Sequence, residues 1–149
     1  MTLSIGDPDV DPTSVMYVNR STNGGLTWGP PIELIRGESP FLFNDKNSMT
    51  ADPFDSRFAY AIWDRSRFPS DVREFHSVAG FPASLRSDAV FTRTTDGGVS
   101  WERARPIFQP RANQFGIGHQ IVVLSDGTLV DGFMLFHGSG RTRRARRSR

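Results

Sequence analysis

Hydrophobic residues occur along this chain in short runs bounded by Gly, Pro, Asp and Asn, a pattern typical of β-strands joined by turns. The clearest run covers residues 57–65, with the sequence Arg-Phe-Ala-Tyr-Ala-Ile-Trp-Asp-Arg. Successive side chains of a strand point to opposite faces, and both faces of this run are apolar. We therefore expect a strand here that is covered on both sides.

Further runs predict strands in the rest of the chain. They cover residues 14–21, 30–35, 48–52, 88–95, 103–108, 119–124 and 128–137. Turns are expected at 7–12, 52–56 and 125–127, connections at 37–47 and 109–117, and a long loop at 66–87 with room for one short helix at 71–76. The pattern as a whole predicts an all-β protein built of antiparallel strands.

An internal repeat punctuates the strands. Ser-Thr-Asn-Gly-Gly-Leu-Thr-Trp at 21–28 returns as Thr-Thr-Asp-Gly-Gly-Val-Ser-Trp at 94–101, and an Arg precedes both copies. The glycine pairs permit the positive φ of a tight turn, and the Asn23 or Asp96 side chain can accept backbone N–H groups inside it. We expect each copy to be a hairpin corner that satisfies its own hydrogen bonds, with Trp28 and Trp101 buried against a neighbouring sheet.

The repeat resembles the Asp-box, or BNR repeat, of sialidases and related β-propellers, whose pattern is Ser-x-Asp-x-Gly-x-Thr-Trp. The first copy matches it at Ser21, Asn23, Gly25, Thr27 and Trp28, and the second at Thr94, Asp96, Gly98, Ser100 and Trp101. The resemblance implies an incomplete β-propeller of four-stranded antiparallel blades, with Asp-box hairpin turns. These turns also occur in propellers that have no glycosidase activity.

The strand order divides the chain into parts of three such blades. Residues 1–36 would form an outer half-blade, residues 44–108 a full blade with the loop insertion 66–87, and residues 118–149 the start of a third blade. Residues 140–147 fall where the third strand of that blade is expected. We accordingly interpret the chain as a fragment, whose partners would include missing propeller blades or other copies of itself.

The resemblance also predicts where a ligand would bind, because Asp-box turns lie on the face of a propeller opposite its ligand site. The expected substrate-binding residues are Asp45, Lys46, Asp64, Arg65 and His119, and the same face would collect Asn44, Asn47, Gln120 and His137. Arg65 and Lys46 would hold a carboxylate, Asp45 or Asp64 would serve as acid or water activator, and His119 would bind hydroxyls.

Structural interpretations of the same residues stay open. Residues 45–47 can be ordinary surface, and Asp64 with Arg65 can be an ion pair that ends a strand. The two histidines at 119 and 137 can be structural. Asp131, inside an apolar strand, suggests a buried acceptor for backbone or loop N–H groups.

No catalytic residue is assigned. Sialidases use an arginine triad, a Tyr nucleophile with a Glu partner, and an Asp acid, but the Arg-Ile-Pro signature of the first triad arginine is absent here, and Tyr17 and Tyr60 lie within strands. The resemblance implies a fragment of a sialidase-like glycoside hydrolase that acts on or binds acidic glycans, the fragment itself having no turnover. The alternative is a non-catalytic Asp-box propeller that binds a protein or a glycan.

Composition excludes only a few kinds of site. The chain of 149 residues has no Cys, which excludes disulfides, zinc–thiolate sites and a thiol nucleophile, and we expect neither metal nor cofactor. It has no apolar run long enough for a membrane-spanning helix and no signal peptide, so an extracellular location would require a signal peptide elsewhere in a longer parent.

The charge of the chain is unevenly distributed. Six of the eighteen Lys and Arg residues lie at 141–149, and the remainder has twelve basic against sixteen acidic residues. The body is therefore mildly acidic, and the basic tail alone accounts for the high pI. We read the tail as an interrupted strand, so a glycan or another small carbohydrate, and not a nucleic acid or a membrane, is the expected partner.

Overall fold

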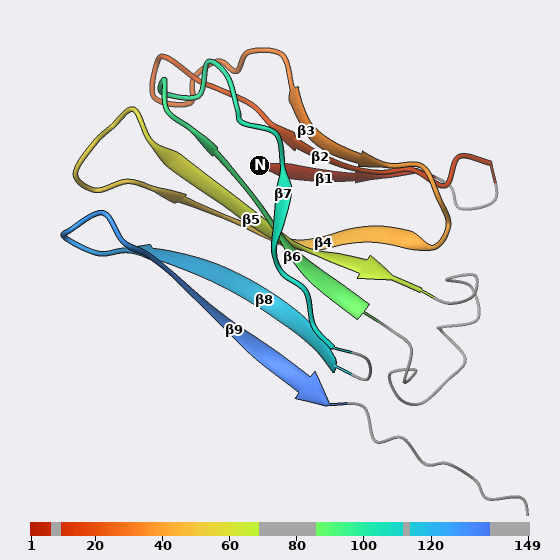
Figure 1. Ribbon diagram of the computed structural model, residues 1–149. Helices are drawn as coiled ribbons and strands as arrows, with labels where there is room; N and C mark the ends of the chain where they lie inside the picture. The colour runs from red at the N-terminus through yellow and green to blue at the C-terminus, as the bar shows by residue number, and fades with distance from the viewer. Residues whose placement is uncertain (7–9, 69–85, 112–113, 138–149) are drawn as a thin grey trace, which may run out of the picture.

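The computed structural model describes residues 1–6, 10–68, 86–111 and 114–137, and this part of the chain holds nine β-strands and no helix (Figure 1). The all-β class expected from the sequence is thus confirmed. The strands are β1 (Thr2–Ile5), β2 (Ser14–Val18), β3 (Ile32–Gly37), β4 (Leu42–Ala51), β5 (Ala59–Arg67), β6 (Arg86–Thr94), β7 (Arg105–Phe108), β8 (Gln114–Val123) and β9 (Leu129–His137).

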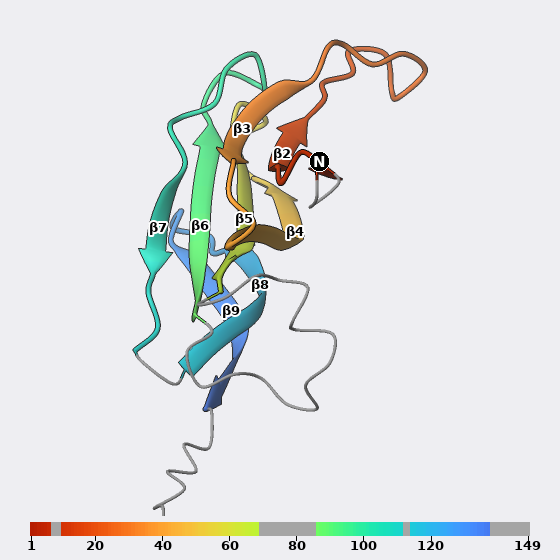
Figure 2. The same ribbon diagram turned by 90° about the vertical axis from the view of Figure 1, so that its right-hand side faces the viewer.

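The strands form three antiparallel sheets. Sheet A has the order β1-β2-β3, sheet B the order β4-β5-β6-β7, and sheet C the pair β8-β9. Sheet B lies between the other two, with sheet A above it and sheet C below it in Figure 1. Figure 2 shows the same layers from the side, with β8 and β9 crossing behind the strands of sheet B. In each sheet, strands that are consecutive in sequence are also neighbours in space.

Both faces of sheet B are buried in hydrophobic contacts. Between sheets A and B, Met16 packs with Ala61, Trp63 and Val90. Between sheets B and C, a second cluster contains Tyr60, Ile62, Ala89, Phe91 and Ile121. The expectation that the strand at 57–65 is covered on both sides is confirmed, because its alternate residues belong to different clusters.

Two connections expected from the sequence are wrong. Strand β4 begins at Leu42 and β8 begins at Gln114, so much of 37–47 and 109–117 is paired backbone. Polar residues such as Asp45 and Lys46 give the start of β4 no strand-like pattern in the sequence. Its extended conformation comes from its pairing with β5. Strand β1 was not expected either; it is short and pairs with the edge of β2. The expected helix at 71–76 lies outside the described residues.

Strands β4 and β8 contain the same irregularity. In β4 the pairing with β5 shifts between Asp45 and Ser48, and in β8 the pairing with β9 shifts between Ile117 and Gln120. Lys46 has a φ of 48° in the first bulge, and Gly118 has a φ of 74° at the corresponding place in the second. The β4–β5 and β8–β9 hairpins therefore share one kind of bulge, formed in the first strand of each.

The two Asp-box turns have matching hydrogen bonds, as expected. In the first, the N–H of Gly25 donates to Ser21 Oγ (2.8 Å) and the N–H of Thr27 donates to Asn23 Oδ1 (2.9 Å). In the second, the corresponding bonds are Gly98 N–H to Thr94 Oγ1 (2.9 Å) and Ser100 N–H to Asp96 Oδ1 (2.9 Å). The glycine pairs have positive φ in both turns, between 70° and 88°.

The two tryptophans of the repeat differ in burial. Trp101 packs against the cluster between sheets A and B. Trp28 is 63% exposed, so the expectation that it is buried is wrong. The reason lies in the neighbours, since sheet A covers Trp101 whereas no described strand covers the corresponding side of sheet A.

This difference predicts unequal effects of truncation. We expect Trp101→Ala to lower the free energy of unfolding by about 2 kcal/mol or more, because it leaves a cavity between two sheets. Trp28→Ala should change it by no more than about 0.5 kcal/mol, as for other exposed positions. Chemical denaturation followed by circular dichroism measures both; equal effects would contradict the observed packing.

The second turn should respond to acid whereas the first does not. Hydrogen bonds from Ser100 hold the pKa of Asp96 at about 2. The Ser100 hydroxyl donates to Asp96 Oδ2 at 2.6 Å. Because the pKa is below its ordinary value of 3.8, this stabilisation is present above pH 4 and lost as pH falls towards 2. Asn23 has no such titration.

Amide NMR can follow this titration turn by turn. We expect the Ser100 amide signal to shift between pH 4 and 2 while the Thr27 signal stays in place. Asp96→Asn should abolish the Ser100 transition and make the second turn behave as the first does. A shift of equal size at both amides would show that the acid response is global and does not come from Asp96.

Candidate functional site

Four of the five expected ligand residues lie at one end of sheet B. Strand β4 begins there and β5 ends there, and their register places Asp45 opposite Asp64 and Asn44 opposite Arg65. The Asp-box turn that follows β6 lies at the other end of the sheet (Figure 1). The sequence grouped these residues correctly along the strands, but their side chains do not share one surface.

Asp64 and His119 are brought together between sheets B and C. His119 Nε2 lies 3.7 Å from Asp64 Oδ1, and both side chains are almost fully buried. The other Asp64 oxygen accepts the N–H of Gly118 at 3.0 Å. This bond uses the β8 bulge, which turns the backbone N–H of Gly118 towards sheet B.

Asp131 completes the cluster from β9. Its Oδ2 lies 2.7 Å from His119 Nδ1, and its side chain keeps 18% exposure. The His119 ring also stacks on Phe133, with centroids 4.4 Å apart. The sequence correctly marked Asp131 as an acceptor, because a carboxylate inside an apolar strand needs a donor, but it did not indicate that the donor is His119.

Burial changes the acidity of Asp64. Loss of hydration, with a smaller contribution from the nearby Asp45 carboxylate, raises its pKa to about 6, although the Gly118 N–H and His119 act in the opposite direction. A carboxyl group with such a pKa can exchange a proton near neutral pH. It cannot reach a substrate in this arrangement, because Asp64 is 1% exposed.

Arg65 lies on the other face of β5, towards sheet A. Its Nη2 is 3.9 Å from where a Cβ of Gly37 in β3 would stand. The side chain is half-buried, and its Nε is fully buried without a hydrogen-bond partner among the described residues. Desolvation lowers the pKa of Arg65, followed by the charge of Arg67. The interpretation of Asp64 and Arg65 as an ion pair is therefore wrong.

Asp88, the acidic residue opposite Arg65 in the β5–β6 pairing, already has other partners. Asp88 stands opposite Arg65 in β6, but its Oδ2 accepts from Arg67 Nη2 at 3.0 Å and from Gln109 Nε2 at 3.4 Å. Arg65 thus makes no ion pair with a carboxylate of the described chain, although the charge of Asp88 favours its charged form. Such a group is costly unless an anion completes it.

Lys46 stands exposed on the β4 bulge. Its backbone N–H donates to Asp45 Oδ1 at 2.8 Å, and its ammonium group makes no ion pair within the described residues. A non-glycine residue with φ of 48° is uncommon, and Gly118 fills the corresponding place in β8. The bulge therefore presents a lysine where backbone strain would favour glycine.

Asn44 is structural, although the sequence placed it on the ligand face. Its amide donates to Ser14 O at 2.8 Å, and its Oδ1 accepts from Trp63 Nε1 at 3.1 Å. This buried network joins sheets A and B and was not found from the sequence, because its members are far apart along the chain. His137 contacts Gln114 at 3.2 Å, across the β8–β9 pair.

Neither tyrosine of the chain is placed as a nucleophile. Tyr60 donates to Asp52 Oδ2 at 2.7 Å, and burial together with this bond raises its pKa to about 12. Tyr17 accepts a hydrogen bond from Arg36 Nη2 at 3.1 Å. The hydroxyl groups of both tyrosines are therefore engaged by other side chains.

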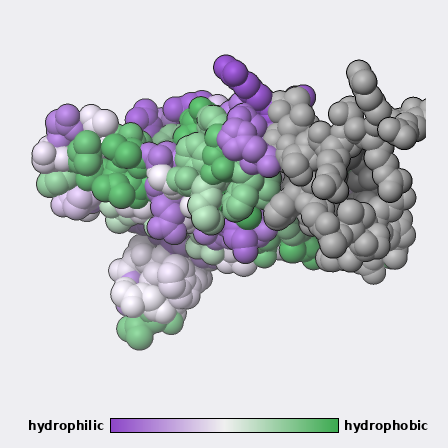
Figure 3. Space-filling model, turned by 90° about the horizontal axis from the view of Figure 1, so that it is seen from below, coloured by the Kyte–Doolittle hydropathy of each residue, from purple (hydrophilic) through white to green (hydrophobic). Residues whose placement is uncertain are grey.

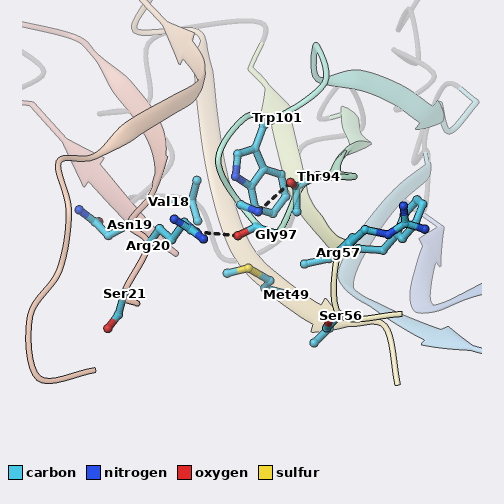
Figure 4. Close-up of a pocket in the computed structure, with 14 residues that line it drawn as sticks. Val18, Asn19, Arg20, Ser21, Met49, Ser56, Arg57, Thr94, Gly97 and Trp101 are labelled. Atoms are coloured by element: carbon cyan, nitrogen blue, oxygen red, sulfur yellow. Dashed lines mark hydrogen bonds between the residues drawn. The ribbon is translucent and has the colours of Figure 1, made fainter. Parts of the chain in front are cut away.

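A pocket of about 240 Å³ lies at the opposite, Asp-box end, between sheets A and B (Figure 4). Arg20, which precedes the first box, crosses it and donates from Nε to Gly97 O of the second box at 2.7 Å. Arg57 lines the far wall and is paired with Asp55. Arg20 thus joins the two turns of the repeat, and none of the expected ligand residues lines this pocket.

Neither a metal nor a membrane is indicated by the described part of the chain. It brings together no group of three or more His, Cys, Asp or Glu side chains that could hold a metal ion. It also contains no helix long and apolar enough to cross a membrane.

Comparison with known proteins adds no family to these observations. No model of a known protein family matches the chain, and no curated protein is significantly similar to it.

Proposed function

We propose that this chain belongs to an Asp-box β-propeller of the sialidase superfamily, whose ligand end binds acidic glycans. Sheet B would be a complete blade, sheet A the outer part of the preceding blade and sheet C the inner hairpin of the next. Three features support this: two turns with the same hydrogen bonds, two hairpins with the same bulge, and stacked sheets whose strands follow one another in sequence.

The proposal that the ligand is acidic is supported mainly by the surroundings of the Arg65 side chain. Its guanidinium is half-buried, has a buried Nε without a partner, and faces no free carboxylate in the described chain. A planar guanidinium binds carboxylates in a bidentate manner, and the acidic group of a glycan is most often a carboxylate. An acidic sugar at this end would therefore neutralise a charge that the protein leaves unpaired.

Lys46 supplies a second positive charge at the same end of sheet B. It is exposed and has no acidic partner in the described residues, so it can approach a ligand that Arg65 holds. The strained bulge supports a functional role, because non-glycine residues with positive φ are concentrated at functional sites.

Binding without turnover is the second candidate function of the parent. It is favoured by Tyr17 and Tyr60, which are both engaged by other side chains, and by the burial of Asp64, which keeps the one carboxyl group of suitable pKa away from a ligand. A non-catalytic propeller would use Arg65 and Lys46 in the same way. The two candidates thus share the binding site and differ only in chemistry supplied elsewhere.

The outer face of sheet C is hydrophobic, which suggests that another part of a propeller covers it. Val122, Val130, Met134 and Phe136 are exposed there. Figure 3 views the molecule from the side on which sheet C lies and shows hydrophobic surface spread over it. In a propeller, another blade would cover this face, whether from the same chain or from another copy.

Arg65→Ala tests the proposal directly. We expect N-acetylneuraminic acid binding to weaken at least tenfold, because the variant loses a charge-assisted bidentate contact worth about 1.5–3 kcal/mol. The control is Arg57→Ala, which removes an exposed arginine at the opposite end of sheet B. Binding is measured by calorimetry, with galactose as the uncharged probe. Unchanged affinity in Arg65→Ala, with the fold intact by circular dichroism, would remove the proposed carboxylate anchor.

Lys46→Gly should separate binding from stability. Glycine relieves the positive φ at the bulge, so we expect the free energy of unfolding to rise by about 0.5–1 kcal/mol. Binding of the acidic sugar should weaken severalfold, and the loss should shrink at high salt, because an exposed charge is screened. Chemical denaturation and calorimetry at two salt concentrations measure the two effects. A variant that is both less stable and equally tight in binding would contradict this role.

A further inference from the structure

A chain of three ionisable side chains crosses from sheet C to sheet B: Asp131, His119 and Asp64. We propose that these residues form a buried proton site that fastens sheet C to sheet B when it is occupied and weakens the contact when it is empty. This inference rests on the described contacts between the sheets and does not depend on the nature of the ligand.

The contact with Asp131 fixes the position of one proton on His119. Asp131 Oδ2 lies 2.7 Å from Nδ1, and an ionised carboxylate can only accept, so we assign the proton of the neutral ring to Nδ1. In the neutral ring, Nε2 is then left as an acceptor. Sheet C therefore turns an acceptor nitrogen towards sheet B.

Asp64 meets this nitrogen with a second acceptor. Its Oδ1 lies 3.7 Å from His119 Nε2, and neither atom has a hydrogen-bond partner although both are fully buried. Two buried acceptors that face each other are unfavourable, because neither recovers the hydrogen bond it would make in water. One additional proton, on either atom, converts this contact into an acid–imidazole hydrogen bond.

The surroundings favour that proton. Asp45 of β4, the other charged group that acts on Asp64, is negative, and Arg65 lies on the opposite face of β5. From sheet C, the Gly118 N–H donates to the other oxygen at 3.0 Å, and this bond and the His119 backbone N–H oppose the proton without outweighing the loss of hydration. Between Asp131 and Asp64 the cluster has two carboxylates and one imidazole, so a second proton reduces its buried negative charge.

Crowding keeps the three groups in place. A Cβ at Gly116 of β8 would stand 3.0 Å from His119 Nε2, so the ring fills the space that this glycine leaves. On its other side the ring stacks on Phe133. His119 therefore cannot turn away from Asp64 to find another donor without disturbing sheet C.

The direction of the pH effect follows from Asp64. Its pKa in the folded protein is about 6, above the ordinary value of 3.8, so the folded state binds the proton more tightly than the unfolded state does. The stabilisation is fully present below pH 4 and is lost as pH rises through 6. Asp55 and Asp96, with pKa values of about 2, act in the opposite direction and only below pH 4.

The test uses the full 149-residue chain and its Asp64→Asn variant. For the wild type, we expect the folding equilibrium constant to fall by about 30-fold between pH 4.5 and 7.5, because Asp64, with a pKa of about 6 in the folded state and 3.8 in the unfolded state, loses its proton over that range. The asparagine amide can donate to Nε2 at any pH, so Asp64→Asn should lose most of this dependence and equal or exceed the wild type in stability at pH 7.5. Asp45→Asn, the matched control, should keep the dependence.

A second measurement covers the case in which the variant fails to fold. Imidazole nitrogen NMR of the wild-type chain should show His119 with its proton on Nδ1 at pH 7.5, and carboxyl carbon NMR should show Asp64 titrating near pH 6. Titration of Asp64 near pH 4, a His119 proton on Nε2 at pH 7.5, or an Asp64→Asn variant that keeps the wild-type pH dependence would each overturn the proposal.

Discussion

Sheet B has no polar face, and the remaining structure depends on that constraint. Alternate residues of β5 belong to two separate hydrophobic clusters, one shared with sheet A and one with sheet C. A sheet that is apolar on both sides requires a layer on each side, because its hydrophobic surface would otherwise remain in water. The stacking of three sheets follows from this requirement, and it places the polar residues at the ends of β4 and β5 between layers.

Polar contacts then fix how the layers fit together. Between sheets A and B, Asn44 is bonded to Ser14 and Trp63, and Arg20 is bonded to the second Asp-box turn. Between sheets B and C, the corresponding contact is the cluster of Asp64, His119 and Asp131. The first interface combines neutral hydrogen bonds with a contact from an arginine, which stays charged, whereas the second depends on an imidazole and two carboxyl groups, so the two should respond differently to pH.

The alternation of side chains along β5 separates two functions that are adjacent in sequence. Asp64 turns towards sheet C and is buried, whereas Arg65 turns towards sheet A and keeps an unpaired charge. The buried carboxyl group of Asp64 affects how firmly sheets B and C hold together. The guanidinium of Arg65 would bind the proposed acidic ligand. A ligand site on this molecule would therefore be formed by cations, with the nearby acid–imidazole cluster acting as its support.

The sequence by itself determined the class of the fold, most strands and both turns. These features are local: strand patterns depend on residues two apart, and each turn is shaped by hydrogen bonds within its own copy of the repeat. Tertiary structure alone decided what lies between the sheets. It packed Trp101 against the hydrophobic cluster between sheets A and B and left Trp28 exposed, it made a strand of the polar stretch around Lys46, and it joined His119 to Asp64 and Asp131. Residues distant in sequence meet there through stacking and bulges, whose geometry is set by neighbouring layers and not by any local pattern.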